Sequence, residues 1–320
     1  MTSALGLGCM GFSQGYGTTD DNESLRAMVR AVEHGVTMLD TAMSYGQGHN
    51  ERLVARLLTE HPQLASRMEV ATKFGIVRDE QGVHLDGRPD HVRENCEGSL
   101  GRLGVDAIDL YYLHRVDPDV PIAETIGAMA KLVTEGKVRH LGVSEVTTDQ
   151  LGAAHAEYPI TAVQFEWSLL WREPELDVIP AARRLGVGLV PYSPLGRGLL
   201  TGTLSGEDID VSDFRRSDPR FHGAELTQND AQVQTLKEVA TQRGLTAGQL
   251  ALAWLLAQGS DVVPIPGSRR ADRVAENADA AAVNLTEEDL RTLERALPAN
   301  AWSGDRQSFA VPAKVRSHSH

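Results

Sequence analysis

The chain has 320 residues, a hydrophobic content of 41% and a formal net charge of −13. That charge argues against nucleic acid as a partner, because the phosphates would repel an acidic protein. No apolar run approaches the ~20 residues that cross a bilayer, so we expect no membrane association. Cys9 and Cys96 provide neither a disulfide framework nor a metal-ligand spacing, and we therefore expect a cytoplasmic protein without a metal.

Short apolar runs alternate with longer segments of helical periodicity along the chain. The predicted helix 122–135 begins after Pro121 and ends before Gly136, which is the usual placement of these two residue types. In chain order, the predicted strands cover residues 5–9, 36–40, 69–73, 108–114, 138–144, 162–165, 188–192 and 262–266. The predicted helices cover residues 21–34, 50–60, 90–103, 122–135, 148–157, 173–185, 227–243, 246–258 and 286–297.

Eight strands that alternate with helices, without a linker-like break in composition, predict one α/β domain over residues 1–320. The architecture that we expect is a closed (β/α)8 TIM barrel. Because such a barrel takes ~250 residues, part of the chain must be additional. The best candidates are a long loop over residues 195–225, after the seventh strand, and a polar tail over residues 298–320. In a barrel, that loop would project from the catalytic end and act as a lid or a binding belt.

Four ionisable side chains lie at or just after the ends of predicted strands. Asp40, Lys73 and His114 each end an apolar run, and Tyr45 follows Asp40 in a glycine-containing loop. We expect them to converge, because the strands of a barrel all end at one face. A phenol, an ammonium, a carboxylate and an imidazole can together protonate an oxygen on which negative charge develops. A buried ammonium would also lower the pKa of a nearby tyrosine from its usual value of about 10.

The later strands carry a second polar set at their ends. Ser144, Gln164 and Tyr192 provide two polar side chains and an aromatic face, which suit a flat heterocycle that bears a carboxamide. After the eighth strand, Ser268 lies where a helix N-terminus could receive a phosphate, and Arg269 and Arg273 share one helical face. A solvated basic turn is the alternative interpretation of this last segment.

The segment 6–11 has the GxGxxG spacing of a dinucleotide-binding turn. No helix pattern begins at Gly11, however, and such a fingerprint requires one. We interpret these glycines instead as residues that let the first strand approach a neighbour or a ligand closely.

Taken together, these motifs resemble those of the aldo-keto reductase superfamily over nearly the whole chain. The segments 113–118 (LHRVDP), 193–198 (SPLGRG) and 267–268 (GS) look most like its bacterial and fungal pyridoxal-reductase-like branch. The resemblance implies a (β/α)8 barrel that binds NADPH or NADP+ across its C-terminal strand ends and reduces a small-molecule carbonyl substrate to an alcohol. It implies that Tyr45 is the general acid. Asp40 and Lys73 would tune that residue, and His114 would orient the carbonyl.

The resemblance also implies the contacts of the nicotinamide dinucleotide. Ser144 and Gln164 would hold the carboxamide, and Tyr192 would stack on the nicotinamide. The segment next to the pyrophosphate would include Ser193, Leu195, Gly196, Gly198 and Leu199. The 2′-phosphate would be bound by Ser268, Arg269 and Arg273, and the adenine by Glu276 and Asn277.

Three features depart from the pattern of many relatives. Glu145 stands where many have Asn, which affects the carboxamide contacts, and Gly267 stands where many have Lys, which shifts 2′-phosphate recognition onto the arginines. The N-terminal hairpin that usually covers the lower end of the barrel is nearly absent.

The sequence gives less information about the substrate than about the cofactor. An apolar wall would be formed by Met10, Phe12, Met43 and Trp167, and it would suit small aromatic or heterocyclic aldehydes. Arg115, next to His114, could instead receive an acidic substituent.

Two other functions remain open at this point. Lys73 could form a Schiff base in a barrel lyase. Alternatively, the fold could serve as a cofactor-sensing regulatory protein with little turnover.

Overall fold

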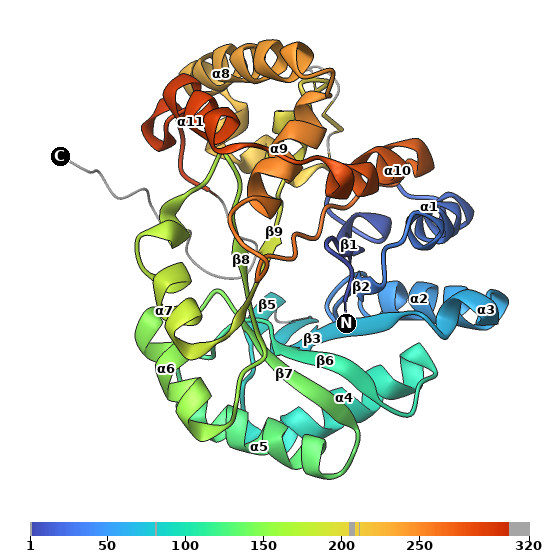
Figure 1. The fold of residues 1–320 in the computed structure, drawn as a ribbon. Helices are drawn as coiled ribbons and strands as arrows, with labels where there is room; N and C mark the ends of the chain where they lie inside the picture. The colour runs from blue at the N-terminus through green and yellow to red at the C-terminus, as the bar shows by residue number, and fades with distance from the viewer. Residues whose placement is uncertain (1, 81, 205–208, 211, 307–320) are drawn as a thin grey trace.

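Seven parallel strands form most of a barrel wall (Figure 1). The computed structural model describes residues 2–80, 82–204, 209–210 and 212–306. In hydrogen-bonded order the strands are β1 (Leu7–Gly8), β2 (Met38–Asp40), β3 (Glu69–Phe74), β6 (Ile108–Leu113), β7 (Val138–Ser144), β8 (Ala162–Glu166) and β9 (Gly188–Tyr192). Each coincides with a predicted strand, although β1 is shorter than expected.

The extended segment 262–266 closes the barrel in the eighth strand position. The N–H groups of Val263 and Ile265 donate hydrogen bonds to β9 at 2.8 and 3.0 Å. On its other edge, the carbonyls of Pro264 and Pro266 accept hydrogen bonds from the β1 segment at 3.0 and 3.2 Å. Because the two prolines have no N–H to donate toward β1, the ladder on this edge is incomplete. The fold is thus the expected (β/α)8 barrel, with an eighth strand interrupted by proline.

Gly8 and Gly267 allow the first strand and the closing segment to come together. A Cβ atom on Gly8 would lie 2.7 Å from the carbonyl oxygen of Ile265, and one on Gly267 would lie 2.4 Å from that of Gly8. Both distances are too short for a real side chain. The interpretation of the glycines in 6–11 as residues of close approach is therefore confirmed at Gly8.

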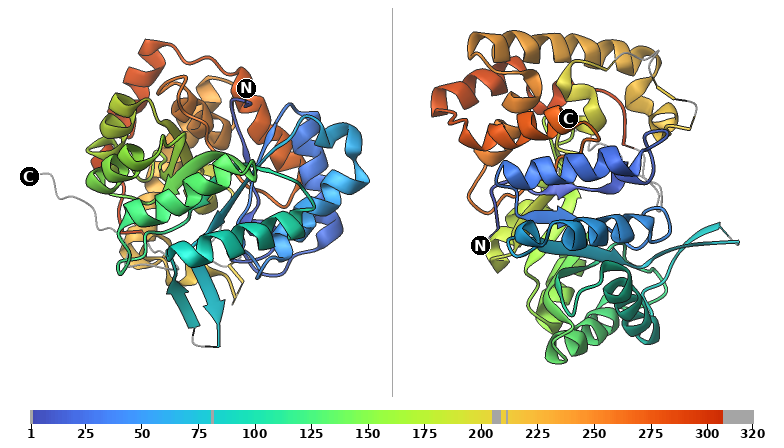
Figure 2. Two further views of the ribbon diagram at one scale, coloured as in Figure 1. Left: turned by 90° about the horizontal axis from the view of Figure 1, so that it is seen from below. Right: turned by 90° about the vertical axis from the view of Figure 1, so that its right-hand side faces the viewer.

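Helices cover the outside of the barrel, and Figure 2 shows them from two further sides. Those that follow the strands are α1 (Asp21–Glu33), α2 (His49–Glu60), α4 (Pro89–Leu103), α5 (Ile122–Thr134), α6 (Thr148–Glu157), α7 (Val178–Leu185), α9 (Ala247–Leu256) and α10 (Ala271–Asp279). The additional helix α8 (Gly223–Gln242) packs beside α9, and α11 (Glu287–Ala296) packs beside α8. Capping boxes begin α6, α9 and α11, as their Thr-x-x-Gln and Thr-x-x-Asp sequences favour.

Two local features differ from the sequence prediction. The predicted helix 173–185 is divided into the 3-10 turn η2 (Glu173–Glu175) and α7, because the Asp177 side chain accepts a hydrogen bond from Val178 and starts a new helix. The short helix α3 (Pro62–Ala65) was not predicted.

A β-hairpin, also unpredicted, projects from the barrel after β3 (Figure 2). Its strands, β4 (Ile76–Asp79) and β5 (Gly82–Leu85), pair in antiparallel fashion. Alternate side chains of a strand share a face, so Ile76 and Arg78 point the same way.

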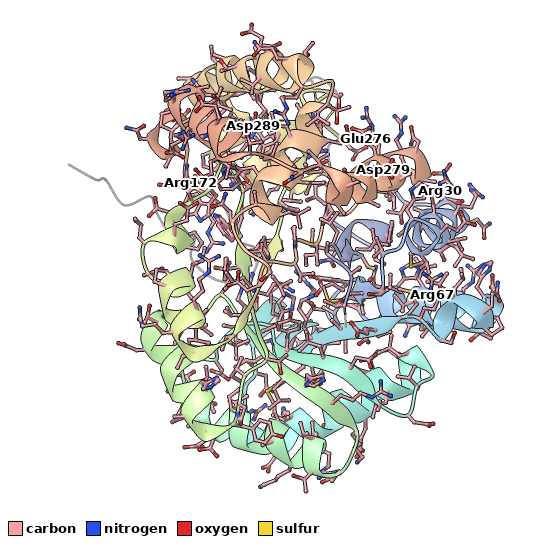
Figure 3. The ribbon with its side chains drawn as sticks, viewed as in Figure 1. Arg30, Arg67, Arg172, Glu276, Asp279 and Asp289 are labelled. Atoms are coloured by element: carbon pink, nitrogen blue, oxygen red, sulfur yellow. The ribbon has the colours of Figure 1, made fainter. Side chains whose placement is uncertain are left out.

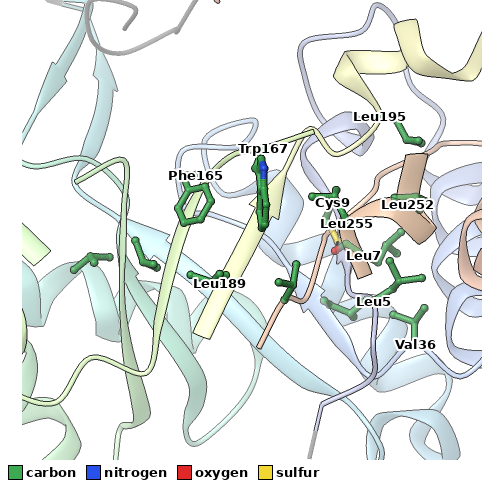
Figure 4. Packing of buried hydrophobic residues seen from close by; sticks show 14 of the residues in the cluster. Leu5, Leu7, Cys9, Val36, Phe165, Trp167, Leu189, Leu195, Leu252 and Leu255 are labelled. Atoms are coloured by element: carbon green, nitrogen blue, oxygen red, sulfur yellow. Dashed lines mark hydrogen bonds between the residues drawn. The ribbon is translucent and has the colours of Figure 1, made fainter. Parts of the chain in front are cut away.

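Two apolar layers hold the barrel together. The larger lies between strands and helices; it includes Trp167, which packs against Phe165 and Trp254 (Figure 4). The smaller layer fills the barrel interior and consists of Met38, Ala71, Tyr112, Ala162, Val190 and Ile265. Gly142 leaves room for the Tyr112 ring in this interior, since a Cβ atom there would lie 2.4 Å from the ring.

The predicted long loop after β9 is anchored by buried charges. Its described parts contain the 3-10 turns η3 (Gly196–Thr201), η5 (Phe214–Ser217) and η6 (Pro219–Phe221), whereas 205–208 and 211 lie outside the described residues. The fully buried Arg220 donates to Glu166 on β8 at 2.6 Å and to Asp218 at 2.8 Å. Arg197 pairs with the same two carboxylates at 3.2 and 2.7 Å. These contacts tie the loop to the barrel.

The expectation of a polar tail over residues 298–320 is wrong for its first part. After the turn η8 (Ala299–Ala301), Trp302 is buried in the core and Arg306 is 5% exposed. Arg306 forms an ion pair with Glu145 and donates a 3.0 Å hydrogen bond to the Tyr192 hydroxyl. Residues 307–320 of the predicted tail lie outside the described residues.

Candidate active site

A layer of polar side chains lies directly above the apolar interior, at the C-terminal ends of the strands. Side chains two positions apart on a strand face the same side. On six strands, an inward-facing interior residue is followed, two positions later, by a polar residue at the barrel mouth. The pairs are Met38 and Asp40, Ala71 and Lys73, Tyr112 and His114, Gly142 and Ser144, Ala162 and Gln164, and Val190 and Tyr192. This spacing brings residues from six elements to one site.

Lys73 and Asp40 form a buried ion pair at the centre of this layer. Lys73 is 0% exposed and Asp40 is 2% exposed. The Lys73 ammonium also donates to the carbonyl of Thr41 at 2.8 Å, and the Gln164 amide donates to the second Asp40 oxygen at 2.9 Å. Each charge thus has both an opposite charge and a further hydrogen bond, which buried charges require.

The loop after β2 holds Tyr45 over that ion pair. Asn50, at the start of α2, accepts from the Thr41 hydroxyl at 2.6 Å and donates to the Cys9 carbonyl at 2.9 Å. The three residues that follow Tyr45 all have positive φ, which turns the chain sharply into α2. The Tyr45 ring centre consequently lies 5.3 Å from the Lys73 nitrogen.

The protonation states suit proton donation by Tyr45. Burial raises the pKa of the Tyr45 hydroxyl above its usual value, and the Lys73 charge only partly opposes this effect. The expectation of a lowered tyrosine pKa is therefore wrong for the protein alone. Burial lowers the pKa of Lys73, but the Asp40 carboxylate and Tyr45 together outweigh it and hold that pKa above its usual value. At neutral pH the site thus contains a protonated tyrosine and an ammonium.

His114 is the second hydrogen-bonding group beside Tyr45. The two rings meet edge to face, with centres 5.8 Å apart. Burial and the neighbouring Arg115 guanidinium lower the pKa of His114 well below its usual value, so the imidazole is neutral at pH 7. Its buried Nδ1 atom has no hydrogen-bond partner among the described residues.

A cavity of about 490 Å³ opens above the polar layer. Three of the four predicted catalytic residues, Asp40, Tyr45 and His114, line it, whereas Lys73 lies beneath Asp40 and Tyr45. The other predicted site residues that line it are Met10, Phe12, Gln164, Tyr192, Ser193, Leu195, Gly198, Ser268, Arg269, Arg273, Glu276 and Asn277. The structure therefore brings most of the predicted site residues together around one cavity.

Five other predicted residues lie outside the cavity lining. Ser144 is buried and accepts a 3.0 Å hydrogen bond from Arg115. Gly196 and Leu199 are buried beneath the loop surface, and Met43 packs on the core. Trp167 also lies in the core, where its indole donates to Glu175 at 2.9 Å.

The far end of the cavity is basic and is formed by the start of α10. Arg269 is held by the backbone carbonyls of Tyr16 and Thr18, and Arg273 pairs with Glu276 at 2.7 Å. Figure 3 labels Glu276 on α10. In the part of the chain that the structure describes, no side chain caps the N-terminus of α10, so its first N–H groups remain available to an acceptor.

Comparison with known proteins identifies the family to which the chain and its fold belong. The family model for the aldo/keto reductase family matches residues 4–298. The chain belongs to that family. It is therefore an oxidoreductase by class.

Individual aldo/keto reductases are similar over most of the chain. A probable aldo-keto reductase of Glycine max is 43% identical over 306 residues, which cover 95% of this chain and 88% of the relative. The glycerol dehydrogenase of Gluconobacter oxydans is 32% identical with a TM-score of 0.84, and 93% of each chain is covered. An aldo-keto reductase of Klebsiella pneumoniae, solved in complex with NADPH, is 27% identical with a TM-score of 0.72, and 93% of this chain and 92% of that chain are covered.

The structure gives a physical reason for Glu145 and Gly267, the two residues at which we expect this chain to differ from many relatives. Glu145 faces Arg306 and Tyr192, with a 3.0 Å hydrogen bond from the Tyr192 hydroxyl. Burial would raise the pKa of Glu145, but the Arg306 guanidinium outweighs it and lowers that pKa to about 2. At Gly267, the nearby Gly8 carbonyl leaves no room for the side chain of a lysine.

Sequence reasoning missed several residues that line the cavity. Arg78 comes from the unpredicted hairpin, and Arg270 from the start of α10. Tyr16 and Phe214 pack edge to face, 5.0 Å apart, and join the loop after β1 to the long loop. The polar segment 79–82, which ends in glycine between two short apolar runs, is a turn signal that could have revealed the hairpin. Among the described residues, no helix has the length and apolar character to cross a membrane, and no group of three or more metal-ligating side chains is assembled.

Proposed function

We propose that the protein reduces an aldehyde or ketone to an alcohol, with NADPH as the reductant and Tyr45 as the proton donor. The observation that carries the proposal is the wall of the cavity formed by Tyr45 and His114 above the buried Lys73–Asp40 pair. Both wall groups are neutral at pH 7, so each can donate a hydrogen bond to a carbonyl oxygen.

The chemistry of the cavity fits an extended dinucleotide that carries phosphates. Tyr192 and Gln164 are available to the nicotinamide end, and Leu195 and Gly198 belong to the segment next to the pyrophosphate. The 2′-phosphate would be bound by the uncapped start of α10 with Ser268, Arg269 and Arg273. The NADPH in the Klebsiella relative supports the same cofactor here. When bound, NADPH supplies the hydride.

The protein's own residues then neutralise the negative charge that develops on the substrate oxygen. Tyr45 gives its hydroxyl proton to that oxygen, and the Lys73 ammonium stabilises the tyrosinate that remains. Asp40 keeps Lys73 charged and fixes its position. His114 donates a hydrogen bond that stabilises the developing alkoxide.

The burial of Lys73 favours this function over a Schiff-base lyase. Lys73 is fully buried beneath Asp40 and does not line the cavity, and its pKa is raised. A lysine that forms a Schiff base must be reachable and must lose its proton. The complete set of Asp40, Tyr45, Lys73 and His114 likewise argues against a regulatory protein without turnover.

Tyr45→Phe tests the proposal. NADPH fluorescence should report unchanged binding to this variant, while NADPH oxidation with pyridoxal or 4-nitrobenzaldehyde should fall by about 10²-fold or more, because the general acid is lost. Pyridoxal is the first substrate to test, since the motifs resemble the pyridoxal-reductase-like branch. Unchanged turnover would refute the role of Tyr45. Tight NADPH binding to the wild type without oxidation of any carbonyl would favour the regulatory function.

A second experiment tests the cofactor assignment. Replacement of both Arg269 and Arg273 by alanine should weaken NADPH much more than NADH, because only NADPH has the 2′-phosphate that guanidinium groups bind. Arg67→Ala is the control, since Arg67 is exposed after α3, far from the cavity (Figure 3). Equal losses for the two cofactors would contradict this role.

A further inference from the structure

The cavity is rich in positive charge although the whole chain carries −13. Among the described residues that line it, seven are arginines, and the acids are Asp40 and Glu276. Asp40 is already paired with Lys73, and Glu276 with Arg273. Among the side chains that line the cavity, positive charges therefore outnumber negative ones.

Most of these arginines already have partners. Four of them pair with carboxylates: Arg197 with Glu166 and Asp218, Arg215 with Asp213, Arg270 with Asp272, and Arg273 with Glu276. Arg269 is bound by two backbone carbonyls at the α10 end. Arg78 and Arg115 remain, and neither has a carboxylate partner within the described part of the chain.

Arg78 and Arg115 are also incompletely hydrogen-bonded. The Arg115 residue is 9% exposed, and its Nη1 atom donates only to neutral acceptors, the His114 carbonyl at 2.6 Å and the Ser144 hydroxyl at 3.0 Å. Within the described residues, the Nε atoms of both arginines are buried without a hydrogen-bond partner. The Arg115 charge lowers the pKa of the nearby Glu145 carboxyl, but no ion pair joins these two residues in that part of the chain. Because a guanidinium nitrogen that is buried without a partner is costly, a group that binds there with negative charge is favoured.

Both guanidinium groups lie at the His114 end of the cavity. Arg115 follows His114 directly, and Arg78 shares the cavity-facing side of β4 with Ile76. Both charges lower the pKa of His114, after the larger effect of burial. Among the described residues, the buried Nδ1 atom of His114 is a third nitrogen there without a partner. The three unpartnered nitrogens thus lie at the His114 end of the cavity, where we propose that the carbonyl reacts.

We propose that Arg78 and Arg115 form an oxyanion-binding subsite that selects aldehydes or ketones bearing a carboxylate or phosphate group. This inference rests on the proposed carbonyl reduction and specifies its substrate class. A guanidinium presents several N–H donors in a plane and binds carboxylate and phosphate oxygens with strong, charge-assisted hydrogen bonds. Met10 and Phe12 line the same cavity, so an aromatic acid that carries an aldehyde matches both its apolar and its cationic parts.

Matched substrates test the subsite. We would compare kcat/KM for 3- and 4-formylbenzoate with that for their neutral methyl esters, and include 4-formylphenyl phosphate as the phosphate arm. The wild type should favour the anions by about 10-fold or more, as a charge-assisted hydrogen bond predicts. Preference for only one of the two anions would identify carboxylate or phosphate as the natural group. Equal kcat/KM for anions and esters would overturn the proposal.

Arg78→Met separates the subsite from the cofactor site. This variant should lose most of the preference for anions, whereas Arg67→Met, which removes an exposed arginine, should retain it. The NADPH dissociation constant of the Arg78→Met variant should stay within about twofold of the wild-type value. A variant that loses NADPH affinity and treats anions and esters alike would show that Arg78 serves the cofactor instead.

Calorimetry keeps the inference testable if no substrate is turned over. Benzoate should bind the wild-type protein in the presence of NADP+ more tightly than benzamide, and Arg78→Met should remove that difference. Absence of turnover together with this result would refute the proposed reduction but retain the anion site. Equal binding of benzoate and benzamide would refute the anion site whatever the turnover.

Discussion

Two buried ionic groups in this barrel have similar composition and different surroundings. The Lys73–Asp40 pair lies at the ends of β2 and β3, directly beneath a cavity that Tyr45 lines. The Arg220 network with Glu166 and Asp218 lies beneath the long loop, where those three residues do not line the cavity. Both groups are fully paired. Burial of charge alone therefore does not mark a catalytic group. What distinguishes the Lys73–Asp40 pair, which we propose to be catalytic, is a tyrosine next to the open cavity.

Among the variants considered, replacement of Lys73 should have the largest combined effect on stability and turnover. Lys73→Met leaves the Asp40 carboxylate buried without its cation, so the free energy of unfolding should fall by about 3–5 kcal/mol. Turnover should fall by about 10²-fold or more, because Tyr45 loses the charge that stabilises its anion. Urea unfolding and NADPH oxidation measure the two effects.

A double variant separates the two effects. Asp40→Asn added to Lys73→Met removes the unpaired charge and should recover part of the stability without restoring turnover. Recovery of turnover in the double variant would contradict a direct role for the lysine.

The loop network should affect stability more than chemistry. Among the described residues, Arg220→Met leaves Asp218 paired with Arg197, and Glu166 with Arg197 and, at 3.8 Å, with Arg306. The free energy of unfolding should fall by about 3–5 kcal/mol. The kcat of the folded variant at saturating substrate should fall far less than that of Lys73→Met. If the two variants lost kcat equally, the distinction between the two ionic groups would fail.

The smallest expected effect is the contribution of His114 to the pH dependence of stability. Burial and Arg115 lower the pKa of His114 in the folded protein, so below its unfolded pKa of about 6.5 only the unfolded chain takes up this proton. Stability should therefore fall as the pH falls below 6.5, by up to about 1.4 kcal/mol per pH unit from this residue. His114→Asn removes that titration. Its unfolding free energy should fall less steeply between pH 7 and 5 than that of the wild type, and parallel slopes would contradict the lowered pKa.

The strand ends were predictable because one physical rule determines them. Apolar runs that end in Asp40, Lys73 or His114 indicate strands that end at the barrel mouth. The same rule, carried further, would have placed Trp167 correctly. Gln164 faces the interior, so Phe165 and Trp167 must face the helices, and an aromatic residue near a strand end can belong to either side.

Contacts between distant segments were not predictable from local pattern. Arg306 pairs with Glu145, 161 residues earlier, and nothing in the sequence around either residue indicates that contact. The same holds for Gly8 and Gly267, which meet only because the barrel closes there. The raised pKa of Tyr45 also depends on its burial among several elements, which the local sequence of the loop does not reveal.

The seam between the first strand and the proline-containing segment 262–266 has fewer backbone hydrogen bonds than the contacts between the other neighbouring strands. Residues at the two ends of the chain meet along this seam, so its formation closes a loop of nearly the whole protein, and few backbone hydrogen bonds hold it. Gly8 on one side and Gly267 on the other both line the cavity. A ligand that contacts both glycines therefore links the first strand to the closing segment of the barrel. Its binding should slow amide exchange along the seam in proportion to its affinity, and so couple occupancy of the site to the lifetime of the closed fold.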